Sequence, residues 1–131
     1  MKPGLEVGLT AEVSTATTPD MAITFDGPPR VSVFSTPALL WELERAARAV
    51  LEPFLETGEA SVGTSATISH LAATPIGTRV TAKATITAID RRRVSFAVEA
   101  FDEKEKIGEG IHDRFVIDVG RFAARLTEKG G

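Results

Sequence analysis

The clearest helical pattern in the chain begins at Thr36 and ends at Pro53. At about 100° per residue, its apolar residues form one stripe, with Arg45, Arg48 and Glu52 on the other side. Thr36 is a suitable N-cap, and Pro37 fits the first helical position, where its missing N–H loses no partner. Pro53 ends or kinks the helix. The stripe consists of Leu39, Leu43, Ala46, Ala47 and Val50, and it is widened by Leu40 and Leu51.

The pattern after Glu59 changes to alternation with a period of two, in segments rich in Val, Ile, Thr and Ala. This alternation predicts strands, and the short links between the segments favour antiparallel neighbours. The strand candidates are Ser61–Leu71, Thr78–Asp90, Val94–Asp102 and Ile107–Val119. The N-terminal third predicts strands at Leu5–Val13 and Ala22–Phe25, with a short apolar segment at Val31–Phe34, and the tail from Gly120 predicts a short helix that frays.

One long apolar helix and a twisted antiparallel sheet have a simple packing solution, in which the sheet wraps around the helix. We therefore expect an α+β fold with an antiparallel sheet around one central helix, as a single domain over residues 1–131. Such a sheet has free edges, and pairing with a second copy would bury one. A homodimer, or a higher assembly built from it, is the expected state.

Composition restricts the function classes. The formal net charge of −3 argues against a nucleic-acid partner, which usually meets a basic stripe. The one basic cluster, Arg91–Arg93, is interpreted as a solvated turn; the alternative is a contact with the phosphates of a nucleotide carrier. The chain has no cysteine, which excludes disulfides, zinc–thiolate sites and cysteine nucleophiles. No signal peptide and no apolar run of about 18 residues is present, so we expect a cytoplasmic protein without a membrane partner.

Three side chains between Val33 and Thr78 combine a hydroxyl, a carboxylate and an imidazole. His70 ends a strand on the side that also carries Val62, Thr64, Ala66 and Ile68, so it is either a buried structural histidine or a general base. Glu44 borders the apolar stripe of the helix; its alternative role is an ion pair with Arg48. Thr36 is a helix cap, which is compatible with an active-site hydroxyl, and Ser35 offers another hydroxyl beside it.

Three further residues bear on the choice of candidate site residues. Glu42 lies on the far side of the stripe from Glu44, so Glu44 is expected to be the more inward carboxylate. Gly63 lies inside a strand, where glycine marks either a bulge or the close approach of a ligand. His112 has charged neighbours near the end of the last strand and is interpreted as structural or surface-exposed.

The segments that carry these residues resemble the fluoroacetyl-CoA thioesterase-like branch of the hot-dog superfamily. The resemblance covers nearly the whole chain and is strongest from Val33 to Val119. It rests on Thr36 and Glu44 with their spacing, on Gly63-Thr64, on the segment His70-x-Ala-Ala-Thr-Pro-x-Gly, and on Ile107-Gly-x-Gly-x-His.

The resemblance implies a hot-dog fold, a homodimer with active sites near the subunit interface, and hydrolysis of an acyl-CoA thioester. Thr36, Glu44 and His70 match the family's catalytic hydroxyl, carboxylate and imidazole. Gly63 matches a glycine that borders the acyl pocket, and Phe34 and Thr64 are assigned to substrate binding with it. No cofactor is implied beyond the coenzyme A of the substrate.

The chain also departs from the fluoroacetate-specific type. The segment between the second strand and the helix, DGPPRVSVFS, is short, with Phe34 as its main aromatic residue and Phe25 further upstream. Pro37 stands where that type has a small flexible residue. The acyl group is therefore left open.

The expected reaction is thioester hydrolysis. Backbone N–H groups at the helix start and the Thr36 hydroxyl stabilise the oxyanion, Glu44 attacks or activates water, and His70 tunes Glu44 or protonates the leaving thiolate. The rival interpretation is a non-catalytic module that binds acyl-CoA or another small ligand. A hydratase ranks lower, because the predicted helix contains no histidine, and a pure interaction protein would leave the three side chains unused.

Overall fold

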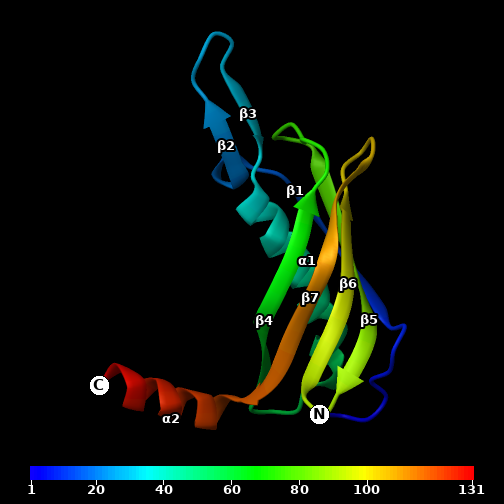
Figure 1. Cartoon of the computed structure of the whole chain (residues 1–131), viewed down its shortest axis with the longest axis vertical. Coiled ribbons are helices and arrows are strands. Elements are labelled where there is room, and N and C mark those ends of the chain that lie inside the picture. Colours follow the sequence, from blue (N-terminus) through cyan, green and yellow to red (C-terminus); the bar gives the residue numbers. More distant parts are fainter.

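The computed structural model describes residues 1–131 as a sheet curled around one long helix (Figure 1). In chain order the strands are β1 (Thr10–Ala16), β2 (Ala22–Phe25), β3 (Val31–Phe34), β4 (Glu59–His70), β5 (Arg79–Asp90), β6 (Arg93–Phe101) and β7 (Lys106–Asp118). The helices are α1 (Thr36–Leu51) and α2 (Val119–Gly130), with 3-10 turns at Pro19–Met21 and Glu52–Phe54. Neither helix is long and apolar enough to cross a membrane.

The main sheet has five strands in the order β1-β5-β6-β7-β4, and all neighbours are antiparallel. Strands β2 and β3 form a separate hairpin that projects beyond the end of the sheet (Figure 1). β1 and β4 are the two edge strands. The α+β class and the central helix expected from the sequence are confirmed.

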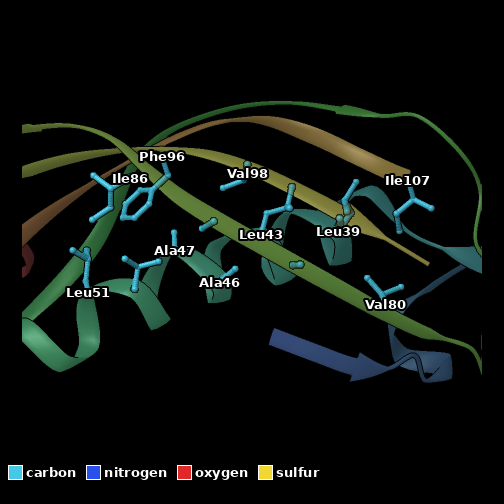
Figure 2. Packing of buried hydrophobic residues seen from close by; sticks show 14 of the residues in the cluster. Leu39, Leu43, Ala46, Ala47, Leu51, Val80, Ile86, Phe96, Val98 and Ile107 are labelled. Atoms are coloured by element: carbon cyan, nitrogen blue, oxygen red, sulfur yellow. The ribbon is translucent and has the colours of Figure 1, made fainter. Parts of the chain in front are cut away.

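The core lies between α1 and the inner face of the sheet (Figure 2). The apolar stripe of α1 packs on residues that alternate along β5 and β6, since every second residue of a strand faces the same side. The fully buried side chains include Leu39, Leu43, Ala46, Ala47 and Leu51 from α1, and Val80, Ile86, Phe96, Val98 and Ile107 from the sheet. The predicted stripe is confirmed, and it fixes which side of α1 faces the strands.

The boundaries of β2, β3 and the four C-terminal strands agree with the predictions within two residues. The prediction of a strand at Leu5–Val13 is wrong, because the strand runs from Thr10 to Ala16. Gly4 and Gly8 have φ of 105° and 97°, which interrupts an extended backbone ahead of Thr10. Leu5 and Leu9 still pack against the core, which explains their apolar character.

A bulge in β4 changes which residues face inward. The register with β7 shifts between Gly63 and Ser65, so Gly63 and Ala66 both lie on the inner face of the sheet, opposite Arg114 and His112. Val62 lies opposite the exposed Phe115 and faces outward. The prediction that Val62 and Thr64 share a side with His70 is therefore wrong, because one extra residue reverses the alternation.

Candidate active site

The first part of the candidate site is a contact between the start of α1 and the end of β4. Oγ1 of Thr36 lies 2.8 Å from Nδ1 of His70. Ser35 is the N-cap, because its side chain accepts a hydrogen bond from the Ala38 N–H at 3.2 Å. The prediction that Thr36 caps the helix is wrong by one position, and the consequence is that its hydroxyl is free to bond His70.

A cleft of about 470 Å³ opens beside this pair. Its walls come from the β2–β3 hairpin, the first residues of α1 and the segment after β4, and they include Ile23, Val33, Phe34, Leu71, Ala72 and Ala73. Phe34 is almost completely buried and lines the cleft from the core side. Nε2 of His70 is buried without a hydrogen-bond partner. The cleft thus combines apolar walls with one hydroxyl–imidazole pair, as small-ligand sites do.

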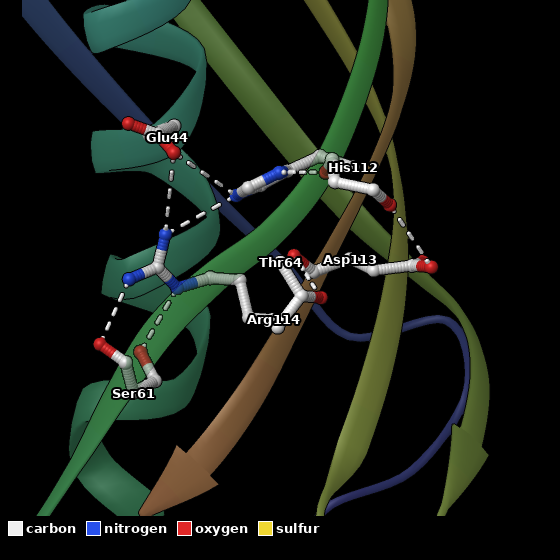
Figure 3. Close-up of polar contacts among 7 residues, drawn as sticks. Glu44, Ser61, Thr64, His112, Asp113 and Arg114 are labelled. Carbon is white, nitrogen blue, oxygen red and sulfur yellow. Dashed lines mark hydrogen bonds and ion pairs between the residues drawn. The ribbon is translucent and has the colours of Figure 1, made fainter.

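The second part lies on the inner face of the sheet, around Glu44 of α1 (Figure 3). Oε1 of Glu44 lies 3.9 Å from Nε2 of His112 and 3.9 Å from Nη1 of Arg114. Both distances exceed direct hydrogen-bond length, and they match a gap that a water molecule can bridge. The Glu44 carboxylate therefore has a cation beside it and free hydrogen-bonding capacity.

The hydrogen bonds of His112 determine its protonation. Nδ1 lies 2.8 Å from the backbone oxygen of Ser65 and must donate to it, while Nε2 accepts from Nη1 of Arg114 at 3.1 Å, because a guanidinium can only donate. Burial, followed by the positive charge of Arg114, lowers the pKa of His112 below the usual histidine value. His112 is thus a neutral imidazole that holds Arg114 in place. Of the two interpretations from the sequence, the structural one agrees with these bonds and the surface-exposed one is wrong, since His112 is 2% exposed.

Arg114 was not identified from the sequence, although it is the only cation that lies beside Glu44. Its guanidinium donates to the hydroxyl and the backbone oxygen of Ser61, both at 2.9 Å (Figure 3). Burial lowers the pKa of Arg114 from its high intrinsic value, and the charge of Glu44 opposes this shift. The alternation His112-x-Arg114 was a signal, but both faces of this strand carry polar residues, so the pattern does not reveal the inner face.

Gly63 lies against the Glu44 carboxylate. A Cβ at this position would come within 2.6 Å of Oε1 of Glu44 and 3.1 Å of Cε1 of His112. Only glycine leaves the space that this carboxylate occupies. Thr64 lies on the other face, where its hydroxyl donates to the backbone oxygen of Asp113.

Glu42, two residues from Glu44 on α1, has a different environment. It is 3% exposed, accepts from Thr15 at 2.5 Å and pairs with Arg45 at 2.6 Å. Glu44 is 29% exposed, so the prediction that Glu44 is the more inward carboxylate is wrong. The edge strand β1 covers Glu42, whereas the side of α1 that carries Glu44 is less completely covered.

The three predicted side chains do not meet in one chain. Thr36 and Glu44 are eight residues apart, which is about 12 Å along a helix axis. Thr36 and His70 are in direct contact, whereas Glu44 is held near Arg114 and His112 and lines none of the cavities.

Comparison with known proteins identifies relatives of this chain. The family of fluoroacetyl-CoA-specific thioesterases (FlK) matches residues 17–120. The fluoroacetyl-CoA thioesterase of Streptantibioticus cattleyicolor is 39% identical over 97 residues, which is 74% of this chain and 70% of that protein. A solved structure of a FlK mutant in complex with acetyl-CoA is 30% identical, with a TM-score of 0.88 over 97% of this chain and 100% of that one.

The fold has more distant relatives. A hot-dog-like protein from Thermanaerovibrio acidaminovorans is 24% identical and has a TM-score of 0.85 over 99% of this chain and 94% of that one. This likeness concerns the fold alone. Together with the family match, it confirms the hot-dog fold and the thioester hydrolase class expected from the sequence: the chain belongs to the family of fluoroacetyl-CoA-specific thioesterases.

Proposed function

We propose that this protein hydrolyses the thioester of a small acyl-CoA. The observation that carries the proposal is the Thr36–His70 hydrogen bond beside a cleft of about 470 Å³, in a chain 39% identical to a fluoroacetyl-CoA thioesterase. The complex of the FlK mutant with acetyl-CoA supports a coenzyme A thioester as the substrate class. No further cofactor enters the reaction.

The start of α1 is assigned to the thioester carbonyl. Pro37 has no N–H, and the Ala38 N–H is used by Ser35, so the Thr36 N–H and hydroxyl are the donors available there. If Nδ1–H of His70 donates to Oγ1 of Thr36, the Thr36 hydroxyl proton is directed to the substrate. These donors, with the partial positive charge of the helix start, stabilise the oxyanion that forms at the carbonyl.

His70 therefore acts through Thr36. Its Nε2 is buried, which removes it from the leaving thiolate, and it has no contact with Glu44 within a chain. Its task in this proposal is to orient the Thr36 hydroxyl. This differs from the proton transfer to sulfur that the sequence suggested.

Glu44 is assigned as the general base. A water held by Glu44 beside Arg114 would lose a proton to the Glu44 carboxylate as its oxygen attacks the carbonyl carbon. The tetrahedral intermediate then collapses, the carbon–sulfur bond breaks, and the proton on Glu44 passes to the leaving sulfur. The products are a carboxylic acid, which ionises at neutral pH, and the free thiol of coenzyme A.

A second copy of the chain completes the site in this proposal. Within one chain, the cleft at Thr36 lacks a carboxylate and Glu44 lacks a cavity. Trp41 is 54% exposed and lies one turn before Glu44 on α1, and an exposed tryptophan is characteristic of an interface. The homodimer thus brings Glu44 of one copy to the Thr36–His70 pair of the other.

The relatives favour small acyl groups, since one is a fluoroacetyl-CoA thioesterase and the FlK mutant was solved with acetyl-CoA. The link between β2 and β3 is the short segment Asp26–Arg30, and of the exposed residues Ile23 and Phe25 of the hairpin, Ile23 lines the cleft. We expect acetyl and other short acyl groups to be turned over, without a strong selectivity for the fluorinated one.

A panel of acyl-CoA thioesters from acetyl upward, assayed by release of free thiol, tests the proposal. The wild type is expected to turn over the short members, and Glu44→Gln and His70→Ala are expected to be strongly impaired while remaining folded. Turnover of no thioester, or wild-type rates in both variants, would contradict it. Saturable binding without turnover would identify a binding module instead.

A further inference from the structure

A basic groove of about 430 Å³ lies on the outer face of the sheet, between α2 and strands β4 and β7. We use "basic groove" for the surface formed by Arg92, Arg121 and Arg125 together with the rings of Phe115 and Phe122. A neighbouring hollow of about 400 Å³ shares Arg92 and Phe115 and adds Arg91, Arg93 and the carboxylate of Asp90. Five arginines thus surround one exposed phenylalanine, in a chain whose net charge is −3.

Several of these guanidinium groups are free. The side chains of Arg121 and Arg125 make no ion pair and no hydrogen bond, whereas Arg92 pairs with Glu59 at 3.2 Å and Arg93 with Asp113 at 2.7 Å. The carboxylate in the groove, Asp118, accepts the backbone N–H of Arg121 as the cap of α2. The groove therefore has an excess of positive charge without an internal partner.

We propose that the basic groove binds the nucleotide end of coenzyme A, an adenosine with a 3′-phosphate and a 5′-diphosphate. This rests on the proposed function and extends it to the part of the substrate remote from the thioester. Arginines bind phosphates through paired, charge-assisted hydrogen bonds, and exposed aromatic rings stack on a base. Phe115, 41% exposed, and Phe122 provide such rings among the free arginines.

The groove lies across β4 from Glu44. Val62 and Thr64 line it, and Gly63 between them faces Glu44 on the opposite side of the sheet. β4 is an edge strand and has β7 as its one neighbour within the chain. The groove and Glu44 are therefore separated by this edge strand, and the flexible pantetheine arm would connect phosphates bound in the groove to a thioester near Glu44.

The test compares two substrates that share an acyl group. One is the coenzyme A thioester, and the other is the pantetheine thioester, which lacks the nucleotide. For the double variant Arg121→Ala/Arg125→Ala, the KM for the coenzyme A thioester is expected to rise roughly tenfold or more, with kcat unchanged. The kinetics with the pantetheine thioester are expected to equal those of the wild type. Lys129→Ala, which removes a charge from α2 outside the groove, serves as the control and leaves both substrates unaffected.

Binding of adenosine 3′,5′-bisphosphate, measured by calorimetry, gives a readout that does not require turnover. Wild type and Lys129→Ala are expected to bind it, the double arginine variant to bind it at least tenfold more weakly, and Phe115→Leu to lose affinity for it but not for pyrophosphate. This binding would persist even if no thioester were hydrolysed, which separates the inference from the proposed function. The inference would be overturned if the double variant had the wild-type KM for the coenzyme A thioester, or if its KM rose equally for both thioesters. It would also be overturned if the double variant changed in oligomeric mass while its KM stayed the same.

Discussion

The two parts of the candidate site differ in what each one lacks. The Thr36–His70 cleft is open, has mostly apolar walls and contains no carboxylate. The Glu44 cluster lies between α1 and the strands β4 and β7, contains a carboxylate, a cation and a neutral imidazole, and lines no cavity (Figure 3). The first region has room for a substrate without a base, and the second has a base without room for a substrate.

The spacing of eight residues between Thr36 and Glu44 keeps the two side chains out of direct contact within one chain. On a helix it separates the two side chains by about 12 Å, so Thr36 lies at the start of α1 and Glu44 near its middle. A dimer that places two copies of α1 side by side in opposite directions would join the two regions.

The largest effect is expected for Glu44→Gln. Removing the base is expected to lower kcat roughly 10²- to 10⁴-fold, with little change in the unfolding free energy. The matched control is Glu42→Gln, two residues away on α1, which is expected to retain nearly the wild-type kcat. Steady-state kinetics of both variants decide the point; equal losses would mean that Glu44 has no special role.

Thr36→Val removes the hydroxyl while it keeps the shape of the side chain. We expect kcat to fall roughly 10²- to 10³-fold, because an oxyanion donor is lost, and KM to change much less. Thr36→Ser retains the hydroxyl and is expected to recover most of the rate. The kinetics of the two variants are compared under identical conditions; a wild-type kcat in the valine variant would remove Thr36 from the mechanism.

Gly63→Ala tests the close packing against Glu44. Its Cβ would lie 2.6 Å from Oε1 of Glu44, which is the flexible end of a side chain and can move. We expect a roughly 10- to 100-fold loss of kcat/KM, since the carboxylate is displaced, with a small change in stability. Gly108→Ala is the contrast, because its Cβ would meet Leu39 in the core at 2.7 Å. Gly108→Ala is expected to lower the unfolding temperature. Loss of activity in Gly108→Ala with loss of stability in Gly63→Ala would refute the assignment of Gly63 to the packing around Glu44.

Glu42→Gln is expected to act on stability. It removes the charge from a buried carboxylate that bonds Thr15 and Arg45, and we expect a loss of about 1–3 kcal/mol in the free energy of unfolding. Urea denaturation of the Glu42→Gln and Glu44→Gln proteins measures the difference. Equal losses would show that the two sides of α1 are not specialised.

The smallest effect concerns pH. Burial lowers the pKa of His112 in the folded protein, so the unfolded chain binds a proton first as the pH falls below about 6.5. Stability contributed by neutral His112 is present above this pH and is lost on acidification, with a slope of at most about 1.4 kcal/mol per pH unit. Urea denaturation at pH 7.5 and 5.5 is expected to show a smaller pH dependence in His112→Asn than in the wild type. The same dependence in both would contradict the neutral state of His112.

The sequence predicted those parts of the fold that depend on periodicity. The helix stripe and the C-terminal strands follow from apolar residues at the correct intervals, because burial of one face imposes that interval. Two features were not determined by it. A bulge was one of two interpretations of Gly63, but its reversal of the alternation of β4 was not foreseen, and the glycines before Thr10 shift the first strand.

The candidate residues were predicted more accurately than their arrangement. Thr36 and His70 do meet, but a pattern on one helix and one strand gave no distance between Glu44 and that pair. Burial of Glu42 depends on Thr15, which lies on a strand far away in sequence. Arg114 was missed because its role depends on facing Glu44 across the sheet, and such long-range contacts cannot be read from local periodicity.

The central claim is that Glu44 and the Thr36–His70 pair form one active site across two copies of the chain. The most direct test mixes inactive Glu44→Gln and His70→Ala proteins after unfolding and refolding them together. A shared site predicts that activity returns to about a quarter of the wild-type value, since half of the dimers are mixed and each has one intact site. A mixture of Thr36→Val with His70→Ala, which damages the same half twice, is expected to stay inactive. No recovery in the first mixture, with mixed dimers demonstrated by mass spectrometry, would contradict the shared site.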